Sequence, residues 1–258
     1  MQVAPQSTAP HGRGSVARIA ILLAASALTA HPQQVSVPFS GGSRPQTLRI
    51  TLHNGGVELH GYDGKEVIFD SGGSGKHKDK SRSGTRPIDI ANGYSLTEDN
   101  NLITIHGAGG GSPRMNLRVP FNTNLEIKCT NCGETGISDI AGDIDVNVTN
   151  GGIRLVNTTG AVLAHSLNSR VFATFAKPPQ KPVSLSTLNG GLDVTVPPDT
   201  KANLNLKTTN GKIYSDFDVR LAGGTLMQPG KGLSGTINGG GVELRLNSFN
   251  GSIYLRRK

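Results

Sequence analysis

The chain has 258 residues, of which 35 are Gly and 14 are Pro, and its 26 basic and 18 acidic residues give a net charge of +8. Only 35% of the residues are hydrophobic, 17% are charged, and Trp is absent. Disorder at such low hydrophobicity goes with a high density of charge, which this chain lacks, so the composition favours an ordered, turn-rich β protein.

The first thirty residues are organised like a secretory signal peptide. Arg13 and Arg18 precede or border an apolar run over residues 19–28, and small residues follow that run. A basic start, a short apolar run and a small-residue exit are typical of an export signal. The competing interpretation is an uncleaved anchor helix, which the shortness of the run disfavours. We expect an exported protein that is periplasmic, attached to the cell surface or secreted.

The expected domain organisation follows from this signal. Residues 1–30 are the signal peptide, 31–44 an N-terminal linker, and 45–258 one domain with a basic Gly/Ser-rich loop inserted at 70–88. After signal cleavage, no apolar run reaches the length of about 18 residues that a membrane-spanning helix needs.

Short alternating segments that begin at glycine-containing corners fill the expected domain. Asn-Gly occurs at seven positions: Asn54, Asn92, Asn150, Asn189, Asn210, Asn238 and Asn250. Most of these corners lead into a strand in which apolar and polar residues alternate, as in Gly152-Ile153-Arg154-Leu155. Gly and Asn accept the positive φ of a tight corner, and alternation places one residue set in the core. The expected inward residues include Ile144, Ile153, Leu192, Val194, Ile213, Val242, Leu244 and Ile253.

This repetition predicts an all-β fold, a single-domain parallel β-solenoid in which each coil buries its inward side chains against the next. The alternative is an antiparallel β-sandwich of hairpins, because Asn-Gly is also a strong two-residue hairpin signal. Two segments interrupt the pattern and are expected to leave the solenoid as loops. One is the insertion at 70–88, and the other is the proline-containing stretch at 173–182.

Residues 76–86 of the insertion form a cluster of cations in which Asp79 is the single acid. The ordinary interpretation of this cluster is a loop exposed to solvent. The functional interpretation is that the cluster contacts an anionic envelope polymer or lipid headgroups. Nucleic acid is not an expected partner, because the protein is exported and aromatic residues are not interleaved with the cations. The residues of this candidate contact are Lys76, Lys78, Lys80, Arg82 and Arg86.

Three aspartates form the one carboxylate cluster that merits a catalytic test. Asp143 and Asp145 share a strand face, and Asp139 lies in the preceding unit. Paired carboxylates can perform acid–base chemistry on sugars or bind a hard cation. The structural interpretation is a cross-strand ion pair, for which Arg154 has the matching phase. We favour the structural interpretation and expect no catalytic residue.

Cys129 and Cys132 have a spacing that occurs in redox and metal motifs. A zinc site would need two further ligands, and no second cysteine pair or His-x₃-His is present. Alternation turns Cys129 inward. A local disulfide, which export favours, and two free thiols both remain open, and no metal or cofactor is expected. Nucleophile-elbow and phosphate-loop motifs are absent from the sequence.

The pattern resembles the putative-adhesin family of exported bacterial proteins. The similarity rests on the signal peptide, residues 56–63 (GVELHGYD), residues 117–120 (LRVP) and the repeated Gly-containing steps from Gly136 onward. It implies a parallel β-solenoid at the cell surface or in the periplasm, and it brings no catalytic residues.

The sequence therefore predicts a non-catalytic envelope protein, a structural or interaction module that could be adhesive. Its expected partner is an anionic polymer, lipid headgroups or another surface protein. The alternatives are a β-helix enzyme acting on polysaccharide and a periplasmic stress or sensing partner protein.

Overall fold

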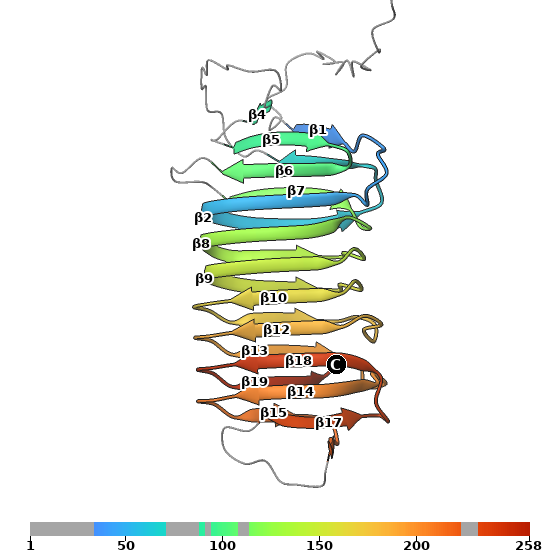
Figure 1. The fold of residues 1–258 in the computed structure, drawn as a ribbon, viewed down its shortest axis with the longest axis vertical. Helices are drawn as coiled ribbons and strands as arrows, with labels where there is room; N and C mark the ends of the chain where they lie inside the picture. Colours follow the sequence, from blue (N-terminus) through green and yellow to red (C-terminus); the bar gives the residue numbers. More distant parts are fainter. Residues whose placement is uncertain (1–33, 71–87, 91–93, 108–113, 223–231) are drawn as a thin grey trace, which may run out of the picture. The chain divides into compact units, whose positions relative to one another are not determined.

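The computed structural model describes residues 34–70, 88–90, 94–107, 114–222 and 232–258. Within these ranges the protein is all-β, and its strands belong to one hydrogen-bonded sheet (Figure 1). The predicted signal peptide and the cationic segment from Lys76 to Arg86 lie outside the described residues. Within the expected linker, 31–44, the structure has one strand, β1 (Gln34–Pro38).

The ladder pairings fall into two series, which form the two faces of a flattened coil. Three long strands turn a corner and contribute one half to each face: β2 (Thr47–Tyr62), β8 (Asn124–Ser138) and β9 (Ile144–Val156). The first face also contains β4 (Ile88–Ile90), β5 (Tyr94–Asp99), β6 (Leu102–Gly107), β10 (Val162–Ser166), β12 (Val183–Thr187), β14 (Ala202–Thr208), β16 (Arg220–Leu221), β17 (Leu233–Ile237) and β18 (Val242–Ser248). The second face also contains β1 (Gln34–Pro38), β3 (Glu66–Asp70), β7 (Arg114–Pro120), β11 (Val171–Thr174), β13 (Leu192–Val196), β15 (Ile213–Ser215) and β19 (Ile253–Arg257).

Successive coils pair in parallel, which is the arrangement of a β-solenoid and not of a sandwich of hairpins. β8 pairs with β2 and β9, β9 pairs with β10 and β11, and these pair in turn with β12 and β13. Antiparallel pairs occur at the ends of the stack. At one end β3 pairs with β7 and β1 with β3, and β5 pairs with β6 and β4 with β5. At the other end β17 pairs with β14 and β16 with β17. These end strands cover edges that would otherwise expose unpaired backbone groups.

The order of coils in space differs from the order in the chain at both ends. β2 lies between the β6/β7 coil and β8, although it precedes both in sequence. The last coil, β18/β19, lies between β12/β13 and β14/β15 (Figure 1). The C-terminal strands therefore separate two coils that are consecutive in the chain.

The core is a set of apolar columns that run from coil to coil. Six of the eight inward residues named above are buried, and Ile213 and Val242 are partly buried and pack against the same core. Because parallel strands are in register, one column contains Leu125, Ile144, Val162, Val183, Leu244 and Leu204. Each side chain therefore gains apolar neighbours from the coils on both sides, which explains why short strands suffice.

One corner of the solenoid carries a ladder of asparagine side chains. The Nδ2 of every asparagine in it except Asn54 donates to the Oδ1 of the asparagine in the neighbouring coil, at 2.8–3.2 Å. The ladder contains, in spatial order, Asn54, Asn131, Asn150, Asn168, Asn189, Asn250 and Asn210. Its order repeats the inserted position of the last coil, because Asn250 lies between Asn189 and Asn210.

Because each of these hydrogen bonds has a direction, replacing different ladder asparagines by aspartate is expected to change stability by different amounts. Within the ladder Asn54 only accepts, whereas Asn150 donates to Asn131 and accepts from Asn168. An aspartate cannot donate, so Asn150→Asp is expected to lower the free energy of unfolding by about 1 kcal/mol or more. Asn54→Asp keeps its acceptor and is the matched control, with little expected change. Thermal melts of both variants at neutral pH test the ladder, and equal losses would contradict it.

Candidate functional site

The outward side chains of the second face form a column that crosses the coils. Parallel register aligns Glu58, Gly136, Arg154, Phe172, Asp193, Tyr254 and Tyr214, in this order. Alternation in the sequence turns Glu58, Asp193, Tyr214 and Tyr254 outward, and all four lie in this column. Glu243, which alternation also turns outward, lies on the first face because it belongs to β18.

An ion-pair cluster occupies the N-terminal part of this column. Arg154 contacts Glu58 at 3.0 Å and Glu134 at 2.9 Å, and Arg114 contacts Glu58 at 3.0 Å. Gly136 lies between Glu58 and Arg154, and a Cβ at that position would overlap the Glu58 carboxylate. Glycine therefore lets Arg154 reach across a whole coil.

The expected pairing of Arg154 with Asp145 is wrong. Both residues belong to β9, but Asp145 precedes the asparagine corner and Arg154 follows it. The corner places them on different faces, where Asp145 pairs in register with Glu126 and Leu163, and Arg154 with Gly136 and Phe172. The alternation of apolar and polar residues predicts which side chains point outward, but not on which of the two faces they lie.

A groove of about 570 Å³ lies on the C-terminal part of the second face, next to the asparagine corner. Phe172, Asp193 and Tyr254 come from three consecutive coils and line it. Its remaining lining is Arg170, Asn189, Gly190, Gly191, Leu192, Asn250, Gly251, Ser252 and Arg256. The groove thus combines aromatic rings, guanidinium groups and side-chain amides.

The groove has one wall that neighbouring side chains hold in place. The rings of Tyr254 and Tyr214 stack with centroids 4.9 Å apart and planes 7° apart. The Arg256 guanidinium lies 5.0 Å from the centroid of the Tyr254 ring, and its Nε donates to Asp193 at 2.8 Å. The Asp193 carboxylate also raises the pKa of Arg256. This wall exists because the last coil is inserted beside β13.

Arg170 differs from the other arginines of this face. Among the described residues it has no ion-pair partner, whereas Arg114, Arg154 and Arg256 each contact a carboxylate. Its neighbours in register on the adjacent coils are Gly152 and Gly191, which have no side chain to cover it.

The predicted carboxylates do not form one cluster. Asp143 and Asp145 line a groove of about 510 Å³ on the first face together with Glu126, and Asp139 is not part of that lining. Asp139 adopts a positive φ of 59° and accepts a hydrogen bond from Asn157 at 2.6 Å. Asp145 accepts from the Asn147 amide at 2.7 Å.

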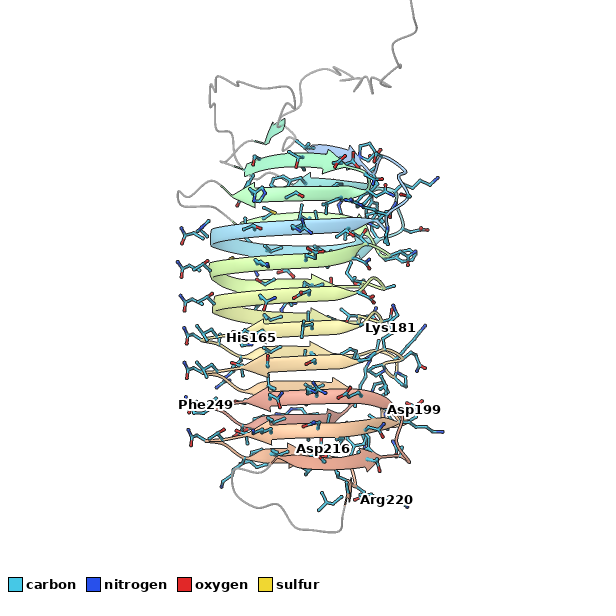
Figure 2. The ribbon with its side chains drawn as sticks, in the orientation of Figure 1. His165, Lys181, Asp199, Asp216, Arg220 and Phe249 are labelled. Atoms are coloured by element: carbon cyan, nitrogen blue, oxygen red, sulfur yellow. A yellow bond between two sulfur atoms is a disulfide. The ribbon has the colours of Figure 1, made fainter. Side chains whose placement is uncertain are left out.

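Asp143 is held in its ionised form. The Lys181 ammonium donates to its Oδ1 at 2.8 Å and the Ala161 N–H donates at 2.9 Å, and together they lower the pKa of Asp143. A carboxyl group with a lowered pKa is a poor proton donor at neutral pH. Figure 2 shows Lys181 at one edge of the coils and Phe249, which precedes a ladder asparagine, at the other.

Removing the lysine is expected to raise the pKa of Asp143. A lowered folded-state pKa stabilises the fold above the unfolded-state pKa, and this contribution is lost as the pH falls through the folded-state value. In Lys181→Gln the NMR titration of the Asp143 carboxyl carbon is therefore expected to move to higher pH. Lys177→Gln, in the same loop, is the control. An unchanged Asp143 titration in Lys181→Gln would contradict the assignment.

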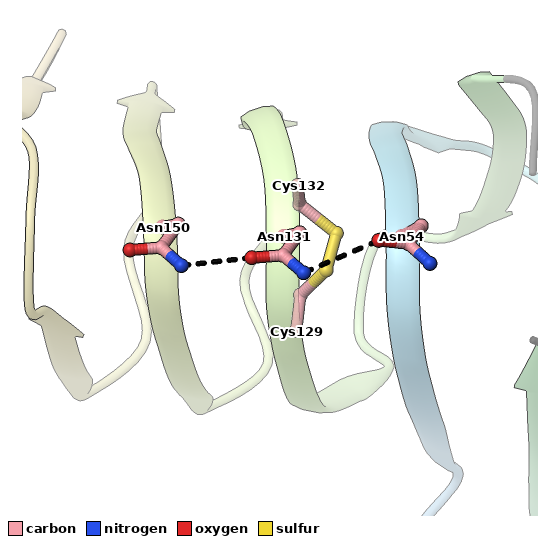
Figure 3. Close-up of a disulfide and its surroundings, with 5 residues drawn as sticks. All are labelled: Asn54, Cys129, Asn131, Cys132 and Asn150. Atoms are coloured by element: carbon pink, nitrogen blue, oxygen red, sulfur yellow. Dashed lines mark hydrogen bonds between the residues drawn. A yellow bond between two sulfur atoms is a disulfide. The ribbon is translucent and has the colours of Figure 1, made fainter. Parts of the chain in front are cut away.

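Cys129 and Cys132 lie on either side of Asn131 and are joined by a disulfide (Figure 3). Both are buried, so the bond lies on the core side of the corner while Asn131 joins the exposed ladder. Within the described ranges, no three His, Cys, Asp or Glu side chains are grouped closely enough to hold a metal ion.

Sequence reasoning missed two features of this region. One is the stacking of Tyr214 on Tyr254, which depends on the position of β19 between β13 and β15. No sequence pattern indicates that position. The Asn-Gly pattern does not indicate Asn168, because Ser169 follows it. The spacing from Asn150 was an available signal, since Asn168 lies one coil of 18 residues further on.

No protein-family model and no curated protein matches the chain. Among solved structures, the chain is similar to a putative cell adhesion protein from Clostridium sporogenes, with 10% sequence identity and a TM-score of 0.46. The alignment covers 88% of this chain and 100% of that one. Membership of the putative-adhesin family stays a prediction. Within the described ranges, no helix has the length and hydropathy needed to cross a bilayer.

Proposed function

We propose that this protein is a non-catalytic binding module of the bacterial cell envelope, exported by its N-terminal signal and adhesive in function. The solenoid is the scaffold, and the second face presents the binding surface. The observation that carries the proposal is the groove beside the asparagine corner, in which aromatic, guanidinium and amide groups line an open surface.

The carboxylates support binding over catalysis. Glycoside hydrolysis needs one carboxyl group that is protonated before reaction and a second one opposite it. The hydrogen bond from Lys181 lowers the pKa of Asp143, which makes it a poorer proton donor, and Asp139 lies outside the groove that contains Asp143 and Asp145. The same residues would serve a structural role: Asp143 accepts a hydrogen bond from Lys181, Asp139 from Asn157, and Asp145 from Asn147 of its own strand.

Rigidity of the second face also favours a binding role. Glu58, Arg114, Glu134 and Arg154 fix one another, and Asp193 fixes Arg256 over the Tyr254 ring. Side chains that are held before binding lose little conformational entropy when a ligand arrives. Phe172, Asp193 and Tyr254 lie on the paired strands β11, β13 and β19, whose backbones are joined by ladder hydrogen bonds.

The test is a sedimentation assay with purified protein and isolated envelope fractions, followed by assay of released reducing ends. We expect saturable binding without release of sugar. Absence of binding would contradict the proposal. Release of reducing ends that Asp143→Asn or Asp145→Asn abolishes would instead establish the polysaccharide-cleaving alternative. Retention of a single protein partner, with no polymer bound, would indicate the sensing alternative.

A further inference from the structure

The geometry points to an acidic glycan as the ligand of the second-face groove, with a uronic-acid ring against Phe172 and its carboxylate on Arg170. This inference rests on the proposed binding function and names its ligand class. It is argued from the exposed ring of Phe172, the cation that has no partner among the described residues, the ladder amides and the pairing of the strands.

Two aromatic rings line the groove, one on either side of the Asp193 position. Phe172 and Tyr254 are separated by the intervening coil that carries Asp193. Neighbouring strands lie about 4.8 Å apart, so the two aromatic positions are about 9.6 Å apart along the stack. Tyr254 already contacts Tyr214 and Arg256, whereas Phe172 is 39% exposed and has no ring or cation contact among the described residues. Phe172 is therefore the ring that is free to stack on a ligand.

The floor of the groove consists largely of residues with small side chains or none. Gly190, Gly191 and Gly251 line the groove next to the column that contains Asp193, together with the small side chain of Ser252. A ring that stacks on Phe172 can therefore approach the backbone of the two neighbouring coils.

The charge of the groove is suited to a monoanion. Arg170 and Arg256 are its cations and Asp193 is its acid, and Asp193 is already paired with Arg256. One guanidinium, that of Arg170, remains without a partner among the described residues. A guanidinium binds a carboxylate through two parallel hydrogen bonds, which fixes the orientation of the ligand.

The ladder provides groups for sugar hydroxyls. Asn189 donates one N–H to Asn168 and accepts one bond from Asn250, and Asn250 likewise donates to Asn189 and accepts from Asn210. Each amide therefore retains a second N–H and a second acceptor site. Both asparagines line the groove, so hydroxyls could bind there without breaking the ladder.

The strand pairing disfavours an acidic peptide as the ligand. Extended peptides gain affinity by adding a strand to an open sheet edge. β13, at the centre of the groove, already pairs with β11 on one side and β19 on the other. A peptide there would leave its backbone groups without sheet partners, whereas a glycan needs only hydroxyl and carboxylate contacts.

The experiment is a calorimetric titration of the purified protein with oligogalacturonate, an oligomer of uronic acid. Phe172→Ala and Arg170→Gln are each expected to weaken binding by at least about tenfold, because they remove the ring or the charged hydrogen bonds. Leu163→Ala and Lys207→Gln are matched controls on the first face, where both residues are exposed, and are expected to change the Kd less than about twofold. Binding is also expected to weaken as salt rises.

Three results would overturn the inference. These are no binding of oligogalacturonate, full binding by Phe172→Ala or Arg170→Gln, and equal or tighter binding of poly-glutamate, which would indicate an acidic peptide. The substituted residues are exposed, so melting temperatures near that of the parent exclude unfolding as the cause of a loss. Envelope binding that persists in both groove variants would reject the glycan site and leave the proposed function standing. Absence of envelope binding by the parent would reject the proposed function itself.

Discussion

Ile153→Asp is expected to prevent the protein from reaching a stable fold. Ile153 is 0% exposed and lies in register between Thr135 and Val171 of the adjacent coils. Loss of its burial costs about 1.5–3 kcal/mol, and a buried unpaired carboxylate adds several kcal/mol, which together rival the whole stability of a typical domain at about 5–15 kcal/mol.

Arg154→Gln is the control for this substitution. Arg154 is the next residue, its side chain is 39% exposed, and it loses only surface ion pairs worth about 0.2–1 kcal/mol each. Circular dichroism melts are expected to show no cooperative transition for Ile153→Asp and a small shift for Arg154→Gln. Equal destabilisation of the two would mean that the assignment of inward and outward residues is wrong.

The second large effect is expected for Gly251→Ala. Gly251 follows a ladder asparagine, and a Cβ there would overlap the backbone carbonyl oxygen of Gly190 in the adjacent coil. Relief of this overlap requires the backbone of one coil to move, so we expect a loss of about 3 kcal/mol, the upper part of the range for overpacking. Close approach between coils, and not turn conformation, is the reason for glycine at this corner.

Gly133→Ala is the matched control, because no atom lies within 4 Å of its Cβ position. It is expected to change stability by less than about 1 kcal/mol. Urea denaturation of both variants measures the difference. A similar loss at Gly133 would show that glycine is needed for another reason than contact between coils.

Local patterns predicted the fold because the solenoid repeats one local unit. Alternation places Ile153 inward and Arg154 outward regardless of which coil is adjacent, and the structure agrees at both positions. The asparagine corners likewise predict where one face ends. Asp145 and Arg154 show the limit of this reasoning, because a period of two does not record that the corner between them changes the face.

The candidate site could not be predicted because it depends on the order of coils in space. Asn210 and Asn250 precede the similar strands β15 and β19. The alternating pattern of either coil, β14/β15 or β18/β19, would fit the apolar columns beside β12/β13. Only the inserted order brings Tyr254 between Asp193 and Tyr214. The sequence likewise does not indicate that Arg170 has no ion-pair partner within the described ranges, since this follows from glycines in two other coils.

Disulfide trapping across the first face tests the inserted position of the last coil most directly. Arg245 lies in register between Ser184 and Asn205. Strands adjacent at about 4.8 Å are within reach of a disulfide, whereas Cα atoms more than about 7 Å apart are not. Under mild oxidation, the double variant Ser184→Cys/Arg245→Cys is expected to form the new bond, and Ser184→Cys/Asn205→Cys is not. Peptide mass mapping that finds the reverse would place β14/β15 directly beside β12/β13 and contradict the account of the groove.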